Sequence, residues 1–481
     1  MDLIRVQKVT GGTLVGAGDV TPLGLKYRSD RVVPGDVFFC VPGFRHDGHE
    51  FAKDAVNRGA VALVVGHEVP GLGVPQLVVG DVREALARSA AEFYGNPSSD
   101  LQIIGITGTN GKTTTTYLCD SVLRQHGMKT GLIGTVETRI GDQRAEAGRT
   151  TPESADLQEL LDAMRTHGVR GVSMEVSSHA IDLHRVDAVH FEVAAFTNLT
   201  QDHLDYHHTI EEYFSVKRRL FTDLDVTHRV VNIDDPMGAV LARDLTDVIT
   251  VGTHASALVR ATDLALDAEG STFTLHVAEE PVPVRLPLAG AFNVSNALVA
   301  AGCAYALAVD LEVIVRGLES APQVPGRLEL VDEGQAFSVY VDYAHTPDSL
   351  EKAIAAVRRV TRGRVLVVFG AGGDRDPDKR GPMGTAAGSA ADHVIITSDN
   401  PRSEDPVGII LQIEDGVRTS GVSYEIEVDR RAAIARAVCQ ASDGDAVLIA
   451  GKGHEDYQLF ADRTVHFDDR EVAREELRAR C

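Results

Sequence analysis

The sequence predicts an α/β protein of three domains. Its 481 residues are about three times the length of a typical domain. A buried strand, a loop of small residues and a helix follow one another over 101–123, and strand and helix patterns alternate through most of the chain. Such alternation favours mostly parallel sheets covered by helices. We expect an N-terminal α/β domain at 1–97, a central P-loop-type domain with a mostly parallel sheet at 98–325, and a C-terminal Rossmann-like domain at 326–481.

The composition restricts the class of partner and the cellular compartment. A net charge of −23 argues against nucleic acid or an anionic membrane as a general partner. The cysteines number five and form no Cys-x-x-Cys pair, which fits a reducing compartment. The N-terminus lacks the apolar core of a signal peptide, and the longest apolar run, 297–309, is too short to span a bilayer. We expect a cytoplasmic protein and take a monomer as its state.

The N-terminal 97 residues carry the signals of a small α/β domain. Strand patterns occur at 37–41 and 60–65, and helix patterns at 51–58 and 83–94. The run Gly95-Asn96-Pro97-Ser98-Ser99 that follows is typical of a linker.

The central domain begins with a strand at 101–106, a loop and a helix, which is the context of a phosphate-binding loop. Glycines let backbone N–H groups approach a polyphosphate, and the helix N-terminus adds partial positive charge. Lys112 would reach the β- and γ-phosphates, and the hydroxyl of Thr113 would hold Mg²⁺. The usual pattern has a glycine five positions before Gly111, where this chain has Ile106. The nucleotide contacts expected here are Gly108, Thr109, Asn110, Gly111, Lys112, Thr113 and Thr114.

Polar groups follow further strands of this domain, at the sheet edge where ligands gather. Thr150 and Thr151 precede Pro152 at the start of a helix pattern that runs to about 164, where they suit either an N-cap or an anion. The carboxylate of Glu175 would reach the metal. Ser177 and Arg185 would contact a substrate. His203 is an unusual ligand for Mg²⁺, so we place it behind the metal ligands or at a second ion.

The loop Thr-Gly-Thr-Asn-Gly-Lys-Thr-Thr resembles the ATP site of the Mur ligase family, whose members couple ATP hydrolysis to amide bond formation in peptidoglycan precursors. Four further blocks match in order: Thr150-Thr151-Pro152, Glu175 to His179, Asn198 to His207, and Lys217. One departure is Leu183, where some members carry glutamine near the substrate peptide.

The resemblance also assigns roles that the residues alone do not indicate. Lys217 alone reads as part of a basic helix face, whereas the family's lysine at this place is carbamylated by CO₂ and becomes an oxygen ligand of Mg²⁺. Carbamylation requires a neutral amine and hence a depressed pKa. Asn293 and Arg327 alone read as a helix cap and a linker charge, and the resemblance implies contacts with adenosine. In the family an Asp-Ser-Arg triplet helps to hold the uridine diphosphate of the substrate. This chain has Arg28-Ser29-Asp30, so only Ser29 keeps its place, and Ser29 alone also suits a turn before a strand.

The C-terminal domain places polar loops after several strand patterns. Asp342 is placed for a ribose hydroxyl, and His345 lies near the phosphates by resemblance. Further loops contain Arg375, then Asp399, Asn400, Pro401 and Arg402, then Gly451 and Glu455. Together they offer both signs of charge, which suits a zwitterionic amino acid. An arginine would clamp a carboxylate with two hydrogen bonds, and the acidic groups would receive an ammonium.

Within the family, Asp-Asn-Pro-Arg at this loop looks like the members that add meso-2,6-diaminopimelate. The resemblance implies an ATP- and Mg²⁺-dependent ligase that phosphorylates the D-glutamyl γ-carboxylate of UDP-N-acetylmuramoyl-L-alanyl-D-glutamate and transfers it to the amine of diaminopimelate. Three alternatives stay open: the same ligase acting on L-lysine or L-ornithine, a ligase similar to folylpolyglutamate synthetase, and a non-enzymatic ATP-binding switch.

Overall fold

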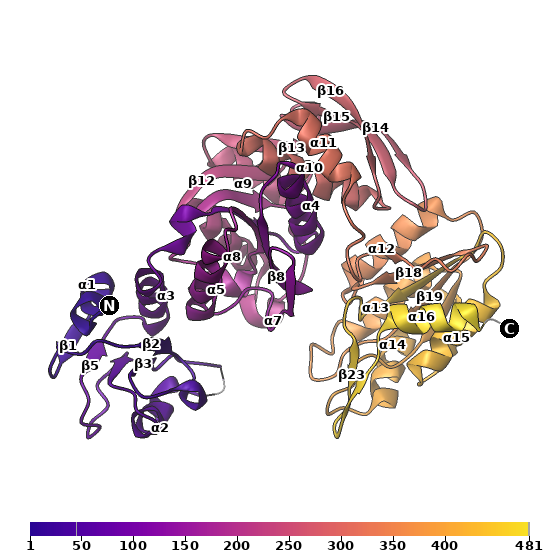
Figure 1. Ribbon diagram of the computed structural model, residues 1–481. Helices are drawn as coiled ribbons and strands as arrows, with labels where there is room; N and C mark the ends of the chain where they lie inside the picture. Colours follow the sequence, from indigo (N-terminus) through magenta and orange to yellow (C-terminus); the bar gives the residue numbers. More distant parts are fainter. Residues whose placement is uncertain (45, 480–481) are drawn as a thin grey trace.

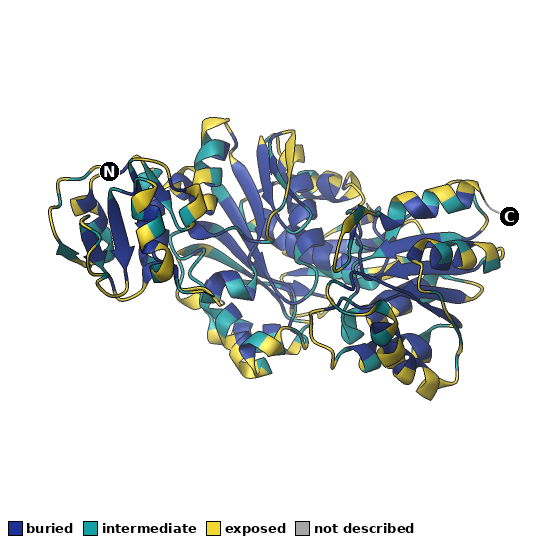
Figure 2. Ribbon diagram, turned by 90° about the horizontal axis from the view of Figure 1, so that it is seen from below, coloured by how far each residue is buried: buried dark blue, intermediate teal, exposed yellow. Residues whose placement is uncertain are grey.

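The computed structural model describes residues 1–44 and 46–479 (Figure 1). Within these residues the strands form three large sheets and one small ribbon, and each sheet takes its strands from one stretch of the chain. The N-terminal and C-terminal parts lie on opposite sides of the middle part in both views (Figures 1 and 2). In the described part of the chain, no helix is long and apolar enough to cross a lipid bilayer.

The first sheet has the strand order β1-β5-β4-β3-β2, in which only β1 runs antiparallel to its neighbour. Its strands are β1 (Thr13–Val15), β2 (Gly24–Lys26), β3 (Asp36–Phe39), β4 (Ala62–Val65) and β5 (Gln76–Val78). Its α-helices are α1 (Leu3–Thr10), α2 (Ala52–Asn57) and α3 (Val82–Phe93). The N-cap of α3 is Asp81, whose carboxylate accepts hydrogen bonds from the N–H groups of Arg83 and Glu84.

The middle sheet has a parallel centre and antiparallel edges, in the order β16-β15-β14-β13-β12-β11-β6-β10-β7-β8-β9. The strands are β6 (Gln102–Thr107), β7 (Thr130–Ile133), β8 (Glu137–Ile140), β9 (Gln143–Glu146), β10 (Gly171–Glu175), β11 (Phe191–Phe196), β12 (Val226–Asn232), β13 (Val248–Gly252), β14 (Val259–Leu266), β15 (Ser271–Val277) and β16 (Glu280–Leu286). The helices are α4 (Lys112–Gln125), α5 (Ser154–Thr166), α6 (Ser178–Asp182), α7 (Leu204–His207), α8 (Ile210–Thr222), α9 (Pro236–Asp244), α10 (Ala291–Ala306) and α11 (Leu311–Glu319).

Helices cover both faces of the middle sheet, as buried apolar side chains on both faces require (Figure 2). One core contains residues of α4, α10 and α11, and the other contains residues of α5, α6, α8 and α9. The helix α5 begins later than the sequence analysis expected, with Glu153 rather than a threonine at its N-cap. The reason is that the Thr151 hydroxyl is used elsewhere, as a donor to the carbonyl of Glu175.

The third sheet has the order β17-β18-β22-β19-β20-β21 and is parallel except at β17. The strands are β17 (Glu329–Leu330), β18 (Ser338–Asp342), β19 (Val365–Phe369), β20 (His393–Ile396), β21 (Ser423–Ile426) and β22 (Ala446–Ala450), and the separate ribbon is β23 (Tyr457–Leu459) with β24 (Thr464–His466). The helices are α12 (Pro347–Val360), α13 (Arg380–Ala390), α14 (Pro406–Ser420), α15 (Arg430–Gln440) and α16 (Asp469–Arg478).

The strand order places the expected site residues beside one another. In the middle sheet, β6 lies between β10 and β11, with Glu175 opposite Ile106 and Phe196 opposite Thr107. The segments that follow these strands therefore leave the sheet at one edge. The α/β fold predicted from the sequence, with a mostly parallel middle sheet, is confirmed.

Candidate active site

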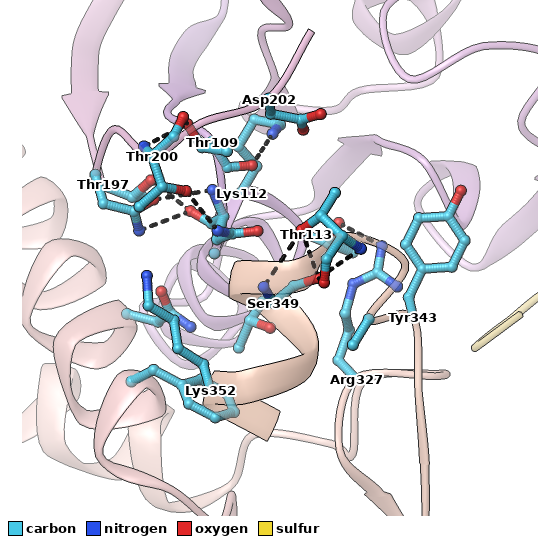
Figure 3. Close-up of a pocket in the computed structure, with 18 of the residues that line it drawn as sticks. Thr109, Lys112, Thr113, Thr197, Thr200, Asp202, Arg327, Tyr343, Ser349 and Lys352 are labelled. Atoms are coloured by element: carbon cyan, nitrogen blue, oxygen red, sulfur yellow. Dashed lines mark hydrogen bonds between the residues drawn. The ribbon is translucent and has the colours of Figure 1, made fainter. Parts of the chain in front are cut away.

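A cavity of about 490 Å³ lies between the middle and C-terminal domains (Figure 3). Its walls bring together these residues from the sequence analysis: Thr109, Asn110, Gly111, Lys112, Thr113, Thr114, Thr150, Glu175, Ser177, His203, Arg327, Asp342 and His345. These residues come from stretches that are far apart in the sequence, and the fold brings them close together in space.

The loop between β6 and α4 is shaped by two glycines. Gly108 and Gly111 have φ values of +149° and +86°, which side chains other than glycine rarely adopt. A Cβ at Gly108 would lie 1.9 Å from Oγ1 of Thr197, and one at Gly111 would lie 2.3 Å from Oδ1 of Asn296. Oδ1 of Asn198 also accepts the N–H of Asn110 at 2.9 Å. The loop is thus held against the next strand end and leads into the N-terminus of α4, as a polyphosphate site requires.

Lys112 is the first residue of α4, and its side chain lies over the phosphate-binding loop that precedes the helix. Its Nζ donates to the carbonyl oxygens of Gly108 at 3.0 Å and Thr109 at 2.8 Å. Burial lowers the pKa of Lys112, and the carboxylates of Glu175 and Asp202 oppose that shift. The amine therefore lies among carbonyls and carboxylates at the mouth of the loop, within the cavity (Figure 3).

Glu175 and Thr113 supply oxygens of the kind that Mg²⁺ prefers. Glu175 is 1% exposed, and its two oxygens accept from the N–H of Thr135 at 2.8 Å and from Oγ1 of Thr135 at 3.1 Å. A carboxylate has about four lone-pair sites, so oxygen valences remain for a cation. Residues 1–44 and 46–479 hold no group of three or more histidine, cysteine, aspartate and glutamate side chains that could bind a metal. Mg²⁺ is usually held by one or two carboxylates together with phosphates and water, and this donor set fits that pattern.

Lys217 lies on α8 behind the phosphate loop and is 1% exposed. Its Nζ donates to the carbonyl of Gly108 at 2.9 Å and lies 4.5 Å from the centre of the Tyr213 ring. Burial lowers the pKa of Lys217 well below its ordinary value, and the positive charge of Lys112 adds to the effect. A buried lysine of this kind favours the neutral amine that reaction with CO₂ needs.

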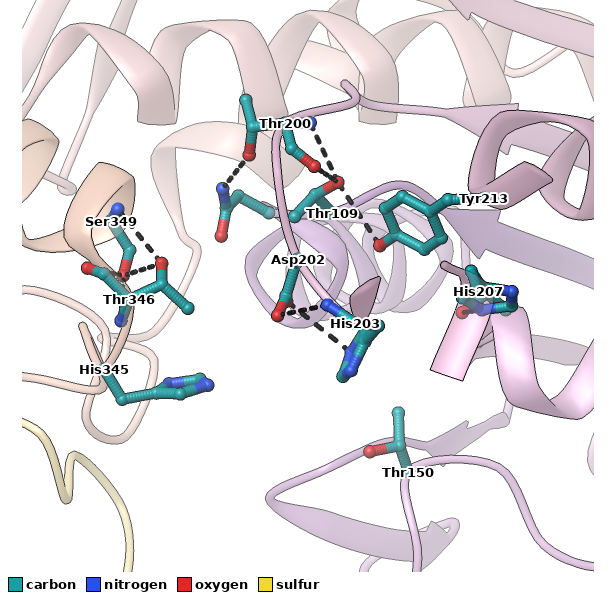
Figure 4. Close-up of polar contacts among 12 residues, drawn as sticks. Thr109, Thr150, Thr200, Asp202, His203, His207, Tyr213, His345, Thr346 and Ser349 are labelled. Atoms are coloured by element: carbon teal, nitrogen blue, oxygen red, sulfur yellow. Dashed lines mark hydrogen bonds and ion pairs between the residues drawn. The ribbon is translucent and has the colours of Figure 1, made fainter. Parts of the chain in front are cut away.

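His203 and Asp202 follow β11 and face the C-terminal domain (Figure 4). Nε2 of His203 lies 3.5 Å from Oδ2 of Asp202. Burial lowers the pKa of His203 to about 4, so its imidazole is neutral near physiological pH. Burial raises the pKa of Asp202, but the interactions of its carboxylate with His203, His345 and Lys112 outweigh burial and lower this pKa overall. Asp202 belongs to the block Asn198 to His207 that was matched in the sequence, although no role was assigned there to Asp202 itself.

Arg327 connects the two domains across the cavity (Figure 3). Its Nη2 donates to Oγ1 of Thr113 at 3.2 Å, and its guanidinium lies 4.5 Å from the centre of the Tyr343 ring. Another contact joins Nδ2 of Asn110 to Oδ2 of Asp348 at 3.3 Å. The two domains therefore touch through residues of the phosphate loop itself.

Backbone groups of other residues orient the side chains of Asp342 and His345. The carboxylate of Asp342 accepts the N–H groups of Leu328 at 2.7 Å and Ala344 at 2.8 Å. Nδ1 of His345 lies 2.8 Å from the carbonyl oxygen of Tyr343, which can only accept, so Nδ1 donates and Nε2 is left for another partner. Burial lowers the pKa of His345.

Asn293 is not part of the cavity wall, which contains Asn296 one turn further along α10. Nδ2 of Asn293 donates to the carbonyl of Ala289 at 2.8 Å, and its Oδ1 accepts from Asn296 at 3.1 Å. Asn293 thus orients Asn296, which the sequence analysis missed. A contact of Asn293 with adenosine stays a prediction.

Of the residues expected near the acidic substrate, Thr150 and Ser177 line this cavity, whereas Thr151 and Arg185 do not. Oγ1 of Thr151 donates to the carbonyl of Glu175 at 2.8 Å and lies 3.2 Å from the N–H of Ser177. Nη1 of Arg185 donates to the carbonyl of Thr151 at 3.2 Å. Ser29 lies outside this cavity, in the short 3₁₀ helix Ser29–Arg31 of the first domain, and its role stays a prediction.

The loops expected to hold an amino acid meet at the carboxyl ends of β19, β20 and β22. Nδ2 of Asn400 donates to Oε2 of Glu455 at 2.7 Å. A Cβ at Gly451 would lie 2.5 Å from Oδ2 of Asp399. Burial raises the pKa of Glu455, and the charge of Asp399 adds to this shift. The two carboxylates therefore share one small volume and favour a cation between them.

Two arginines lie at the other side of this group. Nη1 of Arg402 donates to the carbonyl of Gly373 at 2.6 Å, and Arg402 has a φ of +53°. A Cβ at Gly372 would lie 2.9 Å from Nη1 of Arg402 and 3.8 Å from Cγ of Arg375. Lys452, which no local sequence pattern indicated, is 0% exposed and has its Nζ 3.6 Å from Oε2 of Glu455.

A phosphate-binding loop that faces a Rossmann-like domain across a shared cavity, with a first α/β domain beside it, defines a three-domain P-loop-type α/β protein. Three family descriptions match the chain: "Mur ligase family, catalytic domain" at 23–94, "Mur ligase middle domain" at 106–304 and "Mur ligase, glutamate ligase domain" at 326–453. The chain belongs to the Mur ligase family.

Curated relatives match over almost the whole chain. A protein of Alkaliphilus metalliredigens is 46% identical over 456 residues, which cover 93% of this chain and 92% of the relative. A protein of Geobacillus kaustophilus is 46% identical over 471 residues, 96% of each chain. Both bear the name UDP-N-acetylmuramoyl-L-alanyl-D-glutamate–2,6-diaminopimelate ligase. A solved structure with the same name is 32% identical, covers 100% of this chain and 99% of its own, and superposes with a TM-score of 0.71.

Proposed function

We propose that this protein is an ATP-dependent ligase that joins meso-2,6-diaminopimelate to the D-glutamyl γ-carboxylate of UDP-N-acetylmuramoyl-L-alanyl-D-glutamate, a step of peptidoglycan precursor synthesis. The observation that carries the proposal is the pairing of a phosphate loop with a group of loop residues of both charge signs, on two domains that face each other. The proposal includes the domain limits 1–97, 98–325 and 326–481, and a cytoplasmic monomer.

The reaction has two steps. The γ-carboxylate oxygen attacks the γ-phosphorus of ATP, ADP leaves, and an acyl phosphate forms. The amine of diaminopimelate then attacks the acyl carbon, the C–O bond breaks, and phosphate leaves. Phosphoryl transfer depends mainly on positioning and charge neutralisation. Lys112 and the loop N–H groups hold the β- and γ-phosphates, while Arg327, Asp342 and His345 bind the nucleotide from the opposite domain.

The metal would be held by Thr113, Glu175 and a carbamate on Lys217. When bound, Mg²⁺ neutralises the charge that develops on the transferred phosphoryl group. His203 lies behind this set, and its neutral imidazole can hydrogen-bond without repelling a cation. The two domains also enclose the cavity, and an enclosed site protects an acyl phosphate from water.

The substrates approach from opposite sides. Ser29 of the first domain contacts the uridine diphosphate, and Thr150, Thr151, Ser177 and Arg185 contact the acidic dipeptide. On the C-terminal domain, Arg402 and Arg375 bind the distal carboxylate of the acceptor, and Asp399 and Glu455 bind its ammonium. Asn400, Pro401 and Gly451 shape that pocket. L-lysine has no distal carboxylate, so it would leave these two guanidinium groups without that charged partner.

The test of this function is phosphate release with ATP, Mg²⁺ and the UDP-muramoyl dipeptide. The acceptors meso-diaminopimelate, L-lysine and L-ornithine are supplied in parallel. We expect release with diaminopimelate, at a kcat/KM about 10³-fold or more above that for lysine, because a missed charged partner costs this much in sites built for it. Release mainly with lysine or ornithine would keep the ligase and reject the acceptor. Release with none would reject the ligase and favour an ATP-binding switch.

Substitution of Lys217 tests the carbamate. Lys217→Ala is expected to lower kcat by about 10²- to 10³-fold, the usual cost of losing one group that stabilises developing charge. Formate or acetate should restore part of the activity, because a small carboxylate can take the place of the carbamate oxygens. Arg218→Ala, on the same helix but 42% exposed at its side chain, is the matched control. Full activity of Lys217→Ala would refute the role.

A further inference from the structure

Three arginines share one buried carboxylate where the first and middle domains meet. Oε1 of Glu153 accepts from Nη1 of Arg149 at 2.6 Å and lies 2.9 Å from Nη2 of Arg185. Its Oε2 accepts from Nη1 of Arg83 at 3.4 Å. Glu153 itself is 7% exposed. Three positive charges thus face one negative charge. The side chains of Arg83 and Arg185 are 16% and 11% exposed and that of Arg149 is 54% exposed, and such an excess of positive charge attracts a further anion.

The carboxylate of Glu153 does not serve its own helix. Glu153 is the N-cap residue of α5, yet its side chain makes no capping hydrogen bond. The side chains preferred at this position are those of Asp, Asn, Ser and Thr. Its length instead lets the carboxylate reach the arginines, so its role lies in their placement.

Arg185 has hydrogen-bonding capacity to spare. Its Nη1 donates to the carbonyl of Thr151 at 3.2 Å and its Nη2 faces Glu153 at 2.9 Å. Its Nε is buried and has no hydrogen-bond partner among the described residues. An unpaired buried N–H of a charged group is costly, and an anionic oxygen of a bound substrate would satisfy it. The neighbouring Thr151 hydroxyl lies beside the N–H of Ser177, which lines the cavity.

Arg83 ties this arrangement to the first domain. It belongs to α3, and its Nη2 donates to the carbonyl of Pro42 at 2.9 Å. A second tie joins the Tyr27 hydroxyl of the first domain to Oδ2 of Asp156 on α5 at 2.6 Å. Arg83 of the first domain therefore holds the carboxylate of Glu153, which in turn contacts Arg185. The first domain is also the one expected to bind the uridine diphosphate end of the same substrate.

We infer that Glu153 is a positioning residue. It holds Arg185 in the orientation that receives a carboxylate of the acidic muramoyl dipeptide, and Arg83 makes this orientation depend on the docking of the first domain. The inference rests on the proposed function and adds two residues, Glu153 and Arg83, to the recognition of the acidic substrate.

The experiment is steady-state phosphate release by the full chain, with each of the three substrates varied in turn. Glu153→Gln is expected to raise the KM for the UDP-muramoyl dipeptide about tenfold or more, the effect of weakening a charge-assisted hydrogen bond. The KM values for ATP and diaminopimelate should stay within about twofold, since these ligands do not touch the cluster. Arg83→Met should raise the same KM. The double variant should be less than additive, because both changes act through one contact.

The controls are Glu84→Gln and Arg88→Met. They remove the same kinds of charge from an exposed ion pair on α3, the helix that carries Arg83. Both should leave all three KM values unchanged. An unaltered KM for the dipeptide in either test variant, or an equal rise of all three KM values, would overturn the inference. If Glu153→Gln fails to fold, Arg83→Met decides the question. Absence of phosphate release by the unsubstituted protein would instead reject the proposed function.

Discussion

Lys112→Met is expected to lower kcat for phosphate release by about 10²- to 10³-fold, which corresponds to about 3–4 kcal/mol of transition-state stabilisation. The ammonium lies over the loop, with Nζ 2.8 Å from the carbonyl of Thr109, and it can swing from these carbonyls to the phosphates without a change in the backbone. Methionine preserves the length of the side chain and its packing but offers no positive charge to the developing negative charge.

The measurement is kcat at saturating ATP, dipeptide and diaminopimelate. Lys129→Met is the matched control, because Lys129 belongs to the same domain and its Nζ donates to the carbonyl of His167 at an exposed place. The control should retain its activity. If Lys112→Met kept more than about a tenth of kcat, the loop would not serve phosphoryl transfer in the way proposed.

Arg430→Met is expected to destabilise the C-terminal domain by about 3–5 kcal/mol, the cost of breaking a buried ion pair from one side. Arg430 and Asp469 are both 0% exposed and form two hydrogen bonds of 2.7 Å. Arg430 also donates to the carbonyls of Ala450 at 3.0 Å and Ser398 at 3.4 Å. These carbonyls lie at the bases of the loops that carry Gly451 and Asp399, so the same substitution should loosen the amino-acid pocket.

Hydrogen exchange of the peptides 393–400 and 446–455 measures this effect without assuming that three domains unfold together. Protection there should fall by about 10²- to 4 × 10³-fold, since 1.4 kcal/mol is tenfold. Arg431→Met removes an exposed pair next to it and should change protection by less than about fivefold. The double variant Arg430→Met, Asp469→Leu should recover part of the loss, because it leaves no unpaired charge. Equal protection in Arg430→Met and Arg431→Met would contradict the argument.

Local patterns were enough to predict much of the fold. The strand and helix around the phosphate loop appear as β6 and α4, and the strand pattern before the loop with Gly451 and Glu455 is β22. These elements are readable because their signals lie within a few residues: an apolar run, then small residues that favour a turn, then a helical period. Polar residues at or shortly after the ends of such strands, such as Glu175 and Asp399, were found for the same reason.

Long-range packing explains what the sequence did not reveal. Lys217 read as a residue of a basic helix face until the resemblance was considered, yet it is 1% exposed, because its partner is the carbonyl of Gly108 in a distant segment. Asn296 and Lys452 were missed for the same reason. Asn296 lies on an apolar helix whose facing surface depends on the whole sheet, and Lys452 is buried by loops from three strands.

The contact between Arg327 and Thr113 joins the middle and C-terminal domains, and both domains form the walls of the cavity. A molecule bound in this cavity makes all of its contacts only when the C-terminal domain occupies this position. Binding of that molecule therefore shifts the equilibrium between domain positions toward this one. The loops proposed to bind the acceptor amino acid belong to the same C-terminal domain. Linkage then requires reciprocity: whatever factor the nucleotide contributes to the affinity for the amino acid, the amino acid returns to the nucleotide.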